Sequence, residues 1–297
     1  MPTALITGIT GFTGRYLSAV LEKQGYKVVG LTQGQHDPDN GWFCCDLLDR
    51  SGLADLVAQL QPDVVAHLAA ISFVAHGNAE DIYRTNVVGT RNLLEALTIC
   101  GKTPRAVLLA SSANIYGNAT DDPITESTLP GPANDYAVSK LAMEYMAKLW
   151  MDKLPITIAR PFNYTGRVQA PNFLIPKIVD HYRRGDKEIE LGNLDVARDF
   201  SDVRTVVCAY AKLIELAPAN EVFNVCSGEA VSLERVLDMM ASISGYSIKV
   251  RVNPAFVRES EVKSLRGSNA KLLETIGELA NIPLEQTLRW MFEAGVE

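Results

Sequence analysis

The chain has 297 residues, of which 47% are hydrophobic and 21% are charged, a composition typical of an ordinary globular protein. No run approaches the ~18 consecutive apolar residues of a membrane span, and no basic region precedes an apolar stretch at the N-terminus, so we expect a cytoplasmic protein without membrane contact. The formal net charge of −7 argues against a nucleic-acid surface, and the five cysteines without C-x-x-C spacing predict reduced thiols and no metal site.

Short apolar runs alternate with helical patterns in the first half of the chain, which is typical of β-α units that build a parallel sheet covered on both faces. The right-handed crossover rule then predicts an α/β fold with a Rossmann-type, doubly wound sheet. Strands are expected at 3–7, 27–31, 64–67, 105–110 and 156–160, and helices at 14–23, 51–60, 81–100 and 135–151.

The pattern changes after residue 160 to short strands, loops rich in Pro and Gly, and separate helices. These helices are expected at 173–184, 203–216, 232–242 and 284–292. We therefore predict a Rossmann domain over residues 1–162 and a smaller α/β lobe over residues 163–297. The helix near 203–217 is expected to return and pack on the sheet, so the two parts are interleaved.

Three glycines at three-residue spacing follow the first expected strand and lead directly into a helix. Gly8 suits a tight turn, Gly11 lets the backbone approach a pyrophosphate, and Gly14 lets the helix pack close to the strand. A plain strand-to-helix turn is the alternative for an isolated triplet, but the position after an apolar strand favours a dinucleotide site. The residues of this loop predicted to bind the cofactor are Gly8, Thr10, Gly11, Phe12, Thr13 and Gly14.

The segment Val29-Gly30-Leu31-Thr32-Gln33-Gly34 ends the second expected strand without a carboxylate. An acidic residue usually holds the ribose hydroxyls of NAD at this place, and its absence removes the repulsion that excludes a 2′-phosphate. The segment therefore favours NADP(H), with NAD(H) as the alternative, since no arginine is present there either. Asp46 follows the expected third strand and either accepts a hydrogen bond from the adenine amino group or caps its own loop.

Tyr136 and Lys140 begin an expected helix, and their four-residue spacing places them on one face. A Lys140 cation would lower the pKa of Tyr136 from its usual ~10, so that the phenol could exchange the proton that accompanies hydride transfer. Ser112 leaves the C-terminal end of the 105–110 strand, where ligands of such sheets bind, and would hydrogen-bond the substrate oxygen. A solvated helical pair is the usual explanation of an isolated Tyr-x-x-x-Lys, but the glycine loop and the serine favour catalysis.

Together these motifs resemble the extended short-chain dehydrogenases/reductases, the NAD-dependent epimerase/dehydratase family, which modify nucleotide sugars. The resemblance covers essentially the whole chain and rests on TGITGFTG, Cys45-Asp46-Leu47, His67-Leu68-Ala69-Ala70, TNVVGT at 85–90, SSANIYG, YAVSK and Arg160-Pro161-Phe162-Asn163. It implies that Ser112, Tyr136 and Lys140 form the catalytic triad. It also implies cofactor contacts from Asp46, Leu47, Leu68, Ala69, Ala70, Asn86, Tyr136 and Lys140.

The same resemblance implies a homodimer joined through a four-helix bundle. The helices expected at 81–100 and 135–151 carry apolar residues on more than one face, namely Ile82, Val87, Leu94, Met143, Met146 and Trp150. Burial against the protein's own sheet is the alternative explanation for part of this pattern.

The second half is similar to the GDP-mannose branch of the family, because Gly192-Asn193 precedes Arg198 where epimerases of UDP-sugars more often have Asp-Gly. The segments NVCSG at 224–228, RESEV at 258–262 and RGSN at 266–269 agree with this branch. The predicted substrate is a GDP-linked deoxyhexose bound by residues 163–297. Guanidinium groups match phosphate oxygens, so Arg198 and Arg258 are candidates for a diphosphate clamp, with surface ion pairs as the alternative. The resemblance adds substrate contacts from Asn114, Asn163, Phe173, Lys177 and Glu261, with Asn163 at the diphosphate.

The residue at position 114 distinguishes the two reactions of this branch, 4,6-dehydration and reduction of a 4-keto group. A 4,6-dehydratase needs a general acid/base carboxylate two residues after the catalytic Ser or Thr, and Asn114 cannot carry a proton in that way. We therefore predict reduction of the C4 keto group of GDP-4-keto-6-deoxy-D-mannose by NAD(P)H, giving GDP-D-rhamnose or its C4 epimer GDP-6-deoxy-D-talose. The alternatives are a GDP-mannose 4,6-dehydratase, an NAD-dependent nucleotide-sugar 4-epimerase and, with least support because Tyr136 and Lys140 are both present, a non-catalytic NADP-binding regulator.

Overall fold

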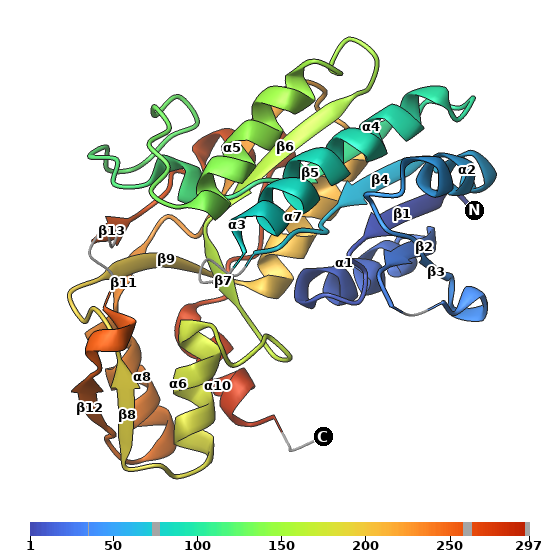
Figure 1. Ribbon diagram of the computed structural model, residues 1–297. Coiled ribbons are helices and arrows are strands. Elements are labelled where there is room, and N and C mark those ends of the chain that lie inside the picture. Colours follow the sequence, from blue (N-terminus) through green and yellow to red (C-terminus); the bar gives the residue numbers. More distant parts are fainter. Residues whose placement is uncertain (35, 73–77, 258–262, 295–297) are drawn as a thin grey trace.

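A parallel sheet of seven strands forms the centre of the computed structural model, which describes residues 1–34, 36–72, 78–257 and 263–294 (Figure 1). The strand order is β10-β6-β5-β4-β1-β2-β3, so the order reverses between β1 and β4. The strands are β1 (Thr3–Thr7), β2 (Lys27–Thr32), β3 (Trp42–Cys44), β4 (Val64–His67), β5 (Ala106–Ala110), β6 (Ile156–Pro161) and β10 (Glu221–Val225). This sheet confirms the predicted doubly wound α/β fold.

Helices cover both faces of the sheet, which explains why its central strands are almost entirely apolar. One face carries α1 (Phe12–Lys23) and α7 (Val203–Leu216), with α9 (Ala270–Ile276) packed on α7 and β10. The other face carries α2 (Arg50–Leu60), α4 (Thr90–Ile99) and α5 (Asp135–Lys148).

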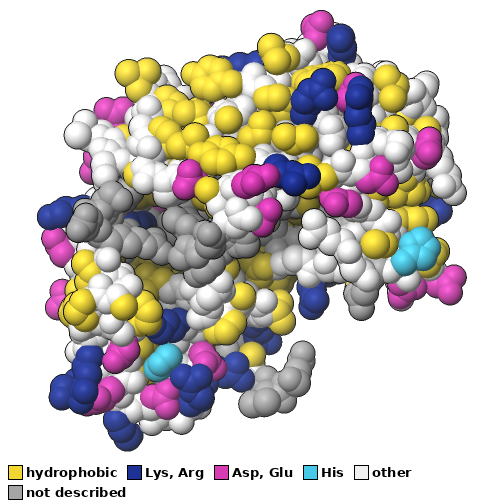
Figure 2. All heavy atoms as spheres, in the orientation of Figure 1, with side chains coloured by type: hydrophobic (Ala, Val, Ile, Leu, Met, Phe, Trp, Pro, Cys, Tyr) yellow, Lys and Arg dark blue, Asp and Glu magenta, His cyan; other side chains and the backbone are white. Residues whose placement is uncertain are grey.

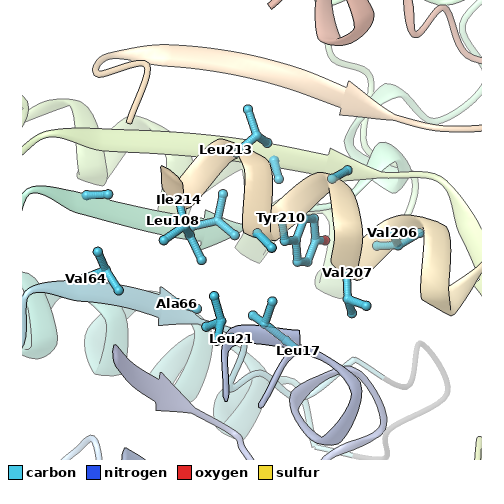
Figure 3. Packing of buried hydrophobic residues seen from close by; sticks show 14 of the residues in the cluster. Leu17, Leu21, Val64, Ala66, Leu108, Val206, Val207, Tyr210, Leu213 and Ile214 are labelled. Atoms are coloured by element: carbon cyan, nitrogen blue, oxygen red, sulfur yellow. The ribbon is translucent and has the colours of Figure 1, made fainter. Parts of the chain in front are cut away.

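The helix α7 packs beside α1 on the same face of the sheet, where it contacts β4, β5 and β6. Figure 3 shows its residues Val206, Val207, Tyr210, Leu213 and Ile214 beside Leu17, Leu21, Val64, Ala66 and Leu108. The sequence analysis did not assign β10 to the sheet, but this strand follows α7 and pairs with β6. The second half of the chain therefore supplies a helix and an edge strand to the Rossmann layer, and the division at residue 162 describes only the first half of that layer.

The remaining elements form a smaller lobe around a second core, drawn below the sheet in Figure 1. Its strands are β7 (Asn163–Thr165), β9 (Ala197–Asp202), β11 (Ala230–Ser232) and β13 (Ser264–Leu265) in one sheet, and β8 (Glu188–Leu191) with β12 (Lys249–Val252) in another. Its helices are α6 (Leu174–Arg183), α8 (Leu233–Ser244) and α10 (Leu284–Phe292).

The expected helix at 81–100 is interrupted. It consists of α3 (Ala79–Tyr83), a π-helical turn (Arg84–Gly89) and α4. The hydroxyl of Thr90 donates to the carbonyl oxygen of Asn86 at 2.7 Å, and the side chain of Asn86 is fully buried against another segment. Such side-chain bonds to the backbone compete with the regular helix ladder, and π-turns are frequent at functional sites. The expected helix is therefore present, but it contains a π-helical turn that the sequence pattern did not indicate.

Among the described ranges, no helix combines the length and the apolar character needed to cross a bilayer. Within the same ranges, no three His, Cys, Asp or Glu side chains are grouped so that they could hold a metal ion. All five cysteines are free thiols, and Cys100 and Cys226 are buried.

Candidate active site

The glycine loop joins β1 to α1 at the C-terminal edge of the sheet. Gly8 has a φ of +73°, a conformation that favours glycine, and its N–H donates to the carbonyl oxygen of Leu31 on β2 at 3.1 Å. A Cβ on Gly14 would lie 2.7 Å from the Cα of Ile9 and closer still to the oxygen of Gly8. Only glycine at position 14 therefore allows α1 to begin so close to β1.

The N-terminus of α1 has the properties of a phosphate site. Its N-cap residue, Gly11, offers no side chain, and its first turn contains no acidic residue. A Cβ on Gly11 would meet only the oxygen of Gly8, at 3.1 Å, so the outer side of the loop is otherwise clear of the described atoms. Helix N-termini attract anions through their free N–H groups and the helix dipole. The loop therefore fits the pyrophosphate of a dinucleotide.

Tyr164, on β7 of the smaller lobe, fixes this loop and was missed by the sequence analysis. Its hydroxyl lies 2.7 Å from the hydroxyl of Thr13, and its ring stacks on Phe12 with a centroid distance of 5.8 Å. The only signal in the sequence is its position directly after Asn163. Another residue missed there is Arg15, whose Nε donates to the carbonyl oxygen of Thr10 at 2.9 Å. The guanidinium of Arg15, a residue of α1, thus bonds the glycine loop, although no arginine directly follows β2.

Asp46 and Leu47 follow β3, where Asp46 is exposed and Leu47 is buried. The carboxylate of Asp46 accepts a hydrogen bond from the N–H of Leu48 at 2.9 Å, which agrees with the loop-capping alternative. The side chain of Leu47 is 5% exposed and belongs to the core on the α2 face. The amide of Asn92 also donates to the carbonyl oxygen of Leu47 at 2.9 Å. The structure therefore places the Leu47 side chain in the core and away from the site.

A buried chain of hydrogen bonds connects the ends of β1 and β4 with the π-helical turn. The hydroxyl of Thr7 accepts the N–H of Ala69 at 3.1 Å and lies 2.7 Å from Nδ1 of His67. On the other side, Nε2 of His67 lies 2.8 Å from the hydroxyl of Thr90, which donates to the oxygen of Asn86. The Thr90 proton is already used in the bond to Asn86, so Nε2 of His67 donates to Thr90. Burial lowers the pKa of His67 to about 3, so the ring is a neutral imidazole near pH 7 and its Nδ1 accepts from the hydroxyl of Thr7.

The segment Leu68-Ala69-Ala70 lies at the sheet edge beside the glycine loop and is half-buried. A Cβ on Gly8 would come within 2.9 Å of the N atom of Ala69, so the two segments are in close contact. The side chain of Asn86 bonds the backbone of Ile71, the residue that follows this segment. Its amide exchanges hydrogen bonds of 2.9 and 3.2 Å with the backbone of Ile71 and donates to the hydroxyl of Ser139 at 3.0 Å. The Asn86 amide is therefore bonded to Ile71 and Ser139 of the protein, whereas the sequence analysis expected it to contact a cofactor directly.

The structure brings Ser112, Tyr136 and Lys140 together at the C-terminal end of β5. Ser112 starts a short 3-10 turn (Ala113–Tyr116), and its Oγ accepts the N–H of Asn114 at 3.1 Å and hydrogen-bonds the phenol of Tyr136. Lys140 lies one helical turn after Tyr136, and its Nζ donates to the carbonyl oxygen of Ala110 at 2.7 Å. All three side chains are buried, with 8% or less of their surface exposed, whereas Asn114 is half-buried.

The electrostatics of this group differ from the sequence-based prediction. Burial raises the pKa of Tyr136 well above its usual value, and the hydrogen bond from Ser112 only partly opposes it. Burial also lowers the pKa of Lys140 to about 8, with Glu144 opposing this effect. Lys140 does not lower the Tyr136 pKa here, because its amine points to the carbonyl oxygen of Ala110. Tyr136 is therefore a protonated phenol near neutral pH and is suited to donate a proton.

Two of the predicted substrate-binding residues lie on neighbouring strands of the smaller lobe. Asn163 is exposed at the start of β7 and pairs in register with Phe200 of β9. Arg198 lies two residues earlier on β9 and donates to the carbonyl oxygens of Ala197 and Lys263 at 2.9 and 3.2 Å. Both residues therefore lie on the paired strands β7 and β9, and Tyr164 follows Asn163 on β7.

The other predicted substrate contacts are dispersed or undescribed. Phe173 is the half-buried N-cap residue of α6, and the Nζ of Lys177 donates to the carbonyl oxygen of Glu190 at 2.7 Å. The bond of Lys177 therefore joins α6 to β8. Arg258 and Glu261 lie outside the described residues.

Asp199 links three segments of the smaller lobe through one buried carboxylate. It accepts the N–H and hydroxyl of Ser227 at 2.8 and 2.7 Å, the N–H of Gly228 at 2.9 Å and the N–H of Gly267 at 3.3 Å. Its side chain is fully buried. Asp199 thus fixes the strand that carries Arg198 against the NVCSG and RGSN segments. The sequence showed these three segments separately but not their contact.

A Rossmann sheet with a glycine loop at β1 and a Ser-Tyr-Lys group at β5 defines an enzyme of the short-chain dehydrogenase/reductase type. The comparison with protein families makes this assignment more specific. The sequence model of the family described as GDP-mannose 4,6 dehydratase matches residues 5–291. The chain belongs to that family, and the resemblance drawn from its motifs is confirmed.

Characterised relatives cover nearly the whole chain. The GDP-6-deoxy-D-talose 4-dehydrogenase of Aggregatibacter actinomycetemcomitans is 34% identical over 92% of this chain and 90% of that protein. The GDP-6-deoxy-D-mannose reductase of Pseudomonas aeruginosa is also 34% identical, over 96% of this chain and 94% of the relative.

Solved structures agree with this assignment. A proposed epimerase from Burkholderia cenocepacia J2315 is 54% identical with a TM-score of 0.93, covering 98% of this chain and 97% of the other. RMD from Pseudomonas aeruginosa in complex with NADPH is 31% identical with a TM-score of 0.86, covering 98% of each chain.

Proposed function

We propose that this protein reduces the C4 keto group of GDP-4-keto-6-deoxy-D-mannose with NADPH. The observation that carries the proposal is Asn114 in the Ser112 turn, at the place where a dehydratase needs a carboxylate. The names of the two relatives at 34% identity, a reductase and a dehydrogenase of GDP-6-deoxyhexoses, support it. The product is GDP-D-rhamnose or its C4 epimer GDP-6-deoxy-D-talose.

In this reaction the side chains bind the carbonyl group and supply a proton. NADPH, when bound, provides the hydride for C4. Ser112 donates a hydrogen bond to the C4 oxygen, and Tyr136, whose pKa is raised by burial, donates its proton to the oxygen as negative charge develops there. Lys140 lies one helical turn after Tyr136, and its amine is held at the end of β5 by the carbonyl oxygen of Ala110.

Arg15 supports NADPH as the cofactor. Its guanidinium folds back onto Thr10 of the glycine loop and is exposed. The residues that end β2, Thr32 and Gln33, carry no charge to repel a 2′-phosphate. We propose that Arg15 pairs with this phosphate, since an arginine near the adenosine ribose is the usual means of accommodating it. The NADPH complex of the 31% identical RMD is consistent with this preference.

For the substrate, we propose that Arg198 and Asn163 bind the diphosphate. They lie on the paired strands β9 and β7, and a guanidinium is well suited to phosphate oxygens. Asp199 supports this placement because its carboxylate fixes β9 from the side of Ser227 and Gly267. Asn114, Phe173 and Lys177 are retained as further candidates for substrate contacts.

We also propose that the protein is a homodimer whose interface includes α4 and α5. Hydrophobic side chains gather over these helices in Figure 2, and Ile99, Tyr145 and Leu149 are 66%, 59% and 75% exposed. Of the apolar residues predicted to support a four-helix bundle, Ile82, Leu94 and Met143 are buried in the protein's own core. Light scattering should give twice the monomer mass, and Leu149→Glu should reduce it to one monomer.

An NAD-dependent 4-epimerase is the second candidate, because a proposed epimerase is 54% identical over 98% of this chain. Such an enzyme retains its oxidised cofactor through each cycle. Denaturing the purified protein and assaying the released nucleotide distinguishes the two: stoichiometric NAD⁺ supports the epimerase, and its absence supports the reductase.

The direct test is incubation of the protein with NADPH, or separately NADH, and freshly made GDP-4-keto-6-deoxy-D-mannose. Loss of absorbance at 340 nm and NMR of the product would establish reduction and the C4 configuration. Tyr136→Phe should lower kcat by about 10²-fold to 10⁴-fold while NADPH still binds, because only the proton donor is removed. Full activity of this variant, or no oxidation by the wild type, would refute the proposal.

A further inference from the structure

A buried ion pair lies directly behind the Ser112, Tyr136 and Lys140 group. Arg160 on β6 donates through Nε and Nη2 to both carboxylate oxygens of Glu144 on α5, at 2.9 and 2.7 Å. The side chains of Arg160 and Glu144 are only 9% and 3% exposed. Glu144 lies one helical turn beyond Lys140, so the pair holds the catalytic helix against the sheet at that turn.

The remaining nitrogen of the same guanidinium reaches the turn that begins at Ser112. Nη1 of Arg160 donates to the phenol oxygen of Tyr116 at 2.8 Å, and this phenol donates to Oδ1 of Asn224 on β10 at 2.7 Å. Tyr116 ends the 3-10 turn that Ser112 begins, and its side chain is fully buried. Nη1 also donates to the carbonyl oxygen of Glu126 at 3.2 Å.

We propose that Arg160 is a positioning residue that sets the distance between Ser112 and the Tyr136–Lys140 helix by bonding Tyr116 and Glu144 at once. The proposal rests on the reductase activity proposed above, since it assigns Arg160 a part in the same reaction. One planar guanidinium fixes the direction of both partners, which a flexible ammonium does not do. The arrangement of the three reacting side chains therefore depends on Arg160 through its bonds to Tyr116 and Glu144.

The ion pair of Arg160 and Glu144 also affects the protonation of Lys140, because Glu144 raises the Lys140 pKa. The titratable groups around this amine are Tyr136 and Glu144 on α5 and the neutral His67 on β4, with Arg160 beyond the Glu144 carboxylate. Burial lowers the Lys140 pKa and the negative charge of Glu144 raises it, so Glu144 keeps Lys140 protonated to a higher pH. If activity requires the ammonium form, it falls as the pH rises through about 8.

Tyr116→Phe tests the link to the Ser112 turn, because it keeps the buried ring and removes the hydroxyl between Arg160 and Asn224. We expect kcat for keto reduction to fall about tenfold, in the range expected when buried partners lose a hydrogen bond, with little change in KM. Hydrogen exchange of the amides at 112–117, followed by mass spectrometry, should become faster. Tyr182→Phe, a buried tyrosine in the core of the smaller lobe, is the matched control and should change neither quantity.

Glu144→Gln tests the effect of the Glu144 charge on the Lys140 pKa. Its alkaline loss of activity should move about one pH unit lower than in the wild type, because Lys140 loses an opposing negative charge. An unchanged kcat, exchange rate and pH profile in these variants would overturn the positioning role. If the wild type does not reduce the keto sugar, the proposed function fails, and the exchange rates at 112–117 still decide whether Tyr116 and Arg160 hold the turn.

Discussion

The neutral histidine between β1 and β4 makes the protein sensitive to acid. His67 is 1% exposed, and its Nδ1 accepts from Thr7 while its Nε2 donates to Thr90. Protonation would turn the Nδ1 acceptor into a second donor facing the Thr7 hydroxyl, which already accepts from Ala69. Burial, with a smaller effect from Lys140, lowers the pKa of His67 from 6.5 to about 3.

The change in unfolding free energy with pH follows from the difference between the His67 pKa of the unfolded chain and that of the folded chain. In the unfolded chain His67 takes up a proton near pH 6.5, whereas in the folded chain it does so only near pH 3, so stability falls between these values as the pH decreases. Each pH unit corresponds to about 1.4 kcal/mol, which gives about 5 kcal/mol over the whole interval and about 2 kcal/mol between pH 7 and pH 5.

Urea unfolding of the protein at pH 7 and pH 5 measures this loss of unfolding free energy. His67→Gln should be less stable at pH 7 but should lose about 2 kcal/mol less than the wild type between the two pH values, because the titrating group is gone. His36→Gln, at an exposed histidine, is the control and should retain the wild-type pH dependence. An identical pH dependence in His67→Gln and the wild type would refute the assignment of a buried neutral imidazole.

Two further predictions concern the cofactor loop. Gly14→Ala should abolish NADPH binding in a fluorescence titration, because its Cβ would lie 2.7 Å from backbone atoms of Ile9. The control Gly131→Ala should bind NADPH normally, because a Cβ at position 131 would make only ordinary contacts. Normal binding by Gly14→Ala would contradict the loop geometry. Arg15→Ala should weaken NADPH binding about tenfold or more and leave NADH binding unchanged, because only the 2′-phosphate loses a charge-assisted partner. Arg91→Ala, at an exposed arginine of α4, is its control, and equal losses for both dinucleotides would exclude the proposed pairing.

The sequence by itself determined the parts of this protein that depend on local spacing. The glycines at positions 8, 11 and 14 and the pair Tyr136 and Lys140 act through one turn or one helical turn, so their geometry follows directly from their separation. The strands β1, β4, β5 and β6 were predictable because strands buried on both faces are mostly apolar. These features were sufficient to predict the Rossmann fold and the family.

Tertiary structure decided which distant groups meet and how burial changes their charge. The edge strand β10 adjoins β6 only because α7 returns across the sheet, and its sequence has no feature that marks this place. Arg160 and Glu144 are 16 residues apart on different elements, so no helical or strand periodicity connects them. The pKa of Tyr136 is raised because its surroundings exclude water, whereas sequence spacing alone suggested that Lys140 would lower it. Spacing defines neighbours along a single element, but desolvation and long-range bonds exist only after the chain has folded.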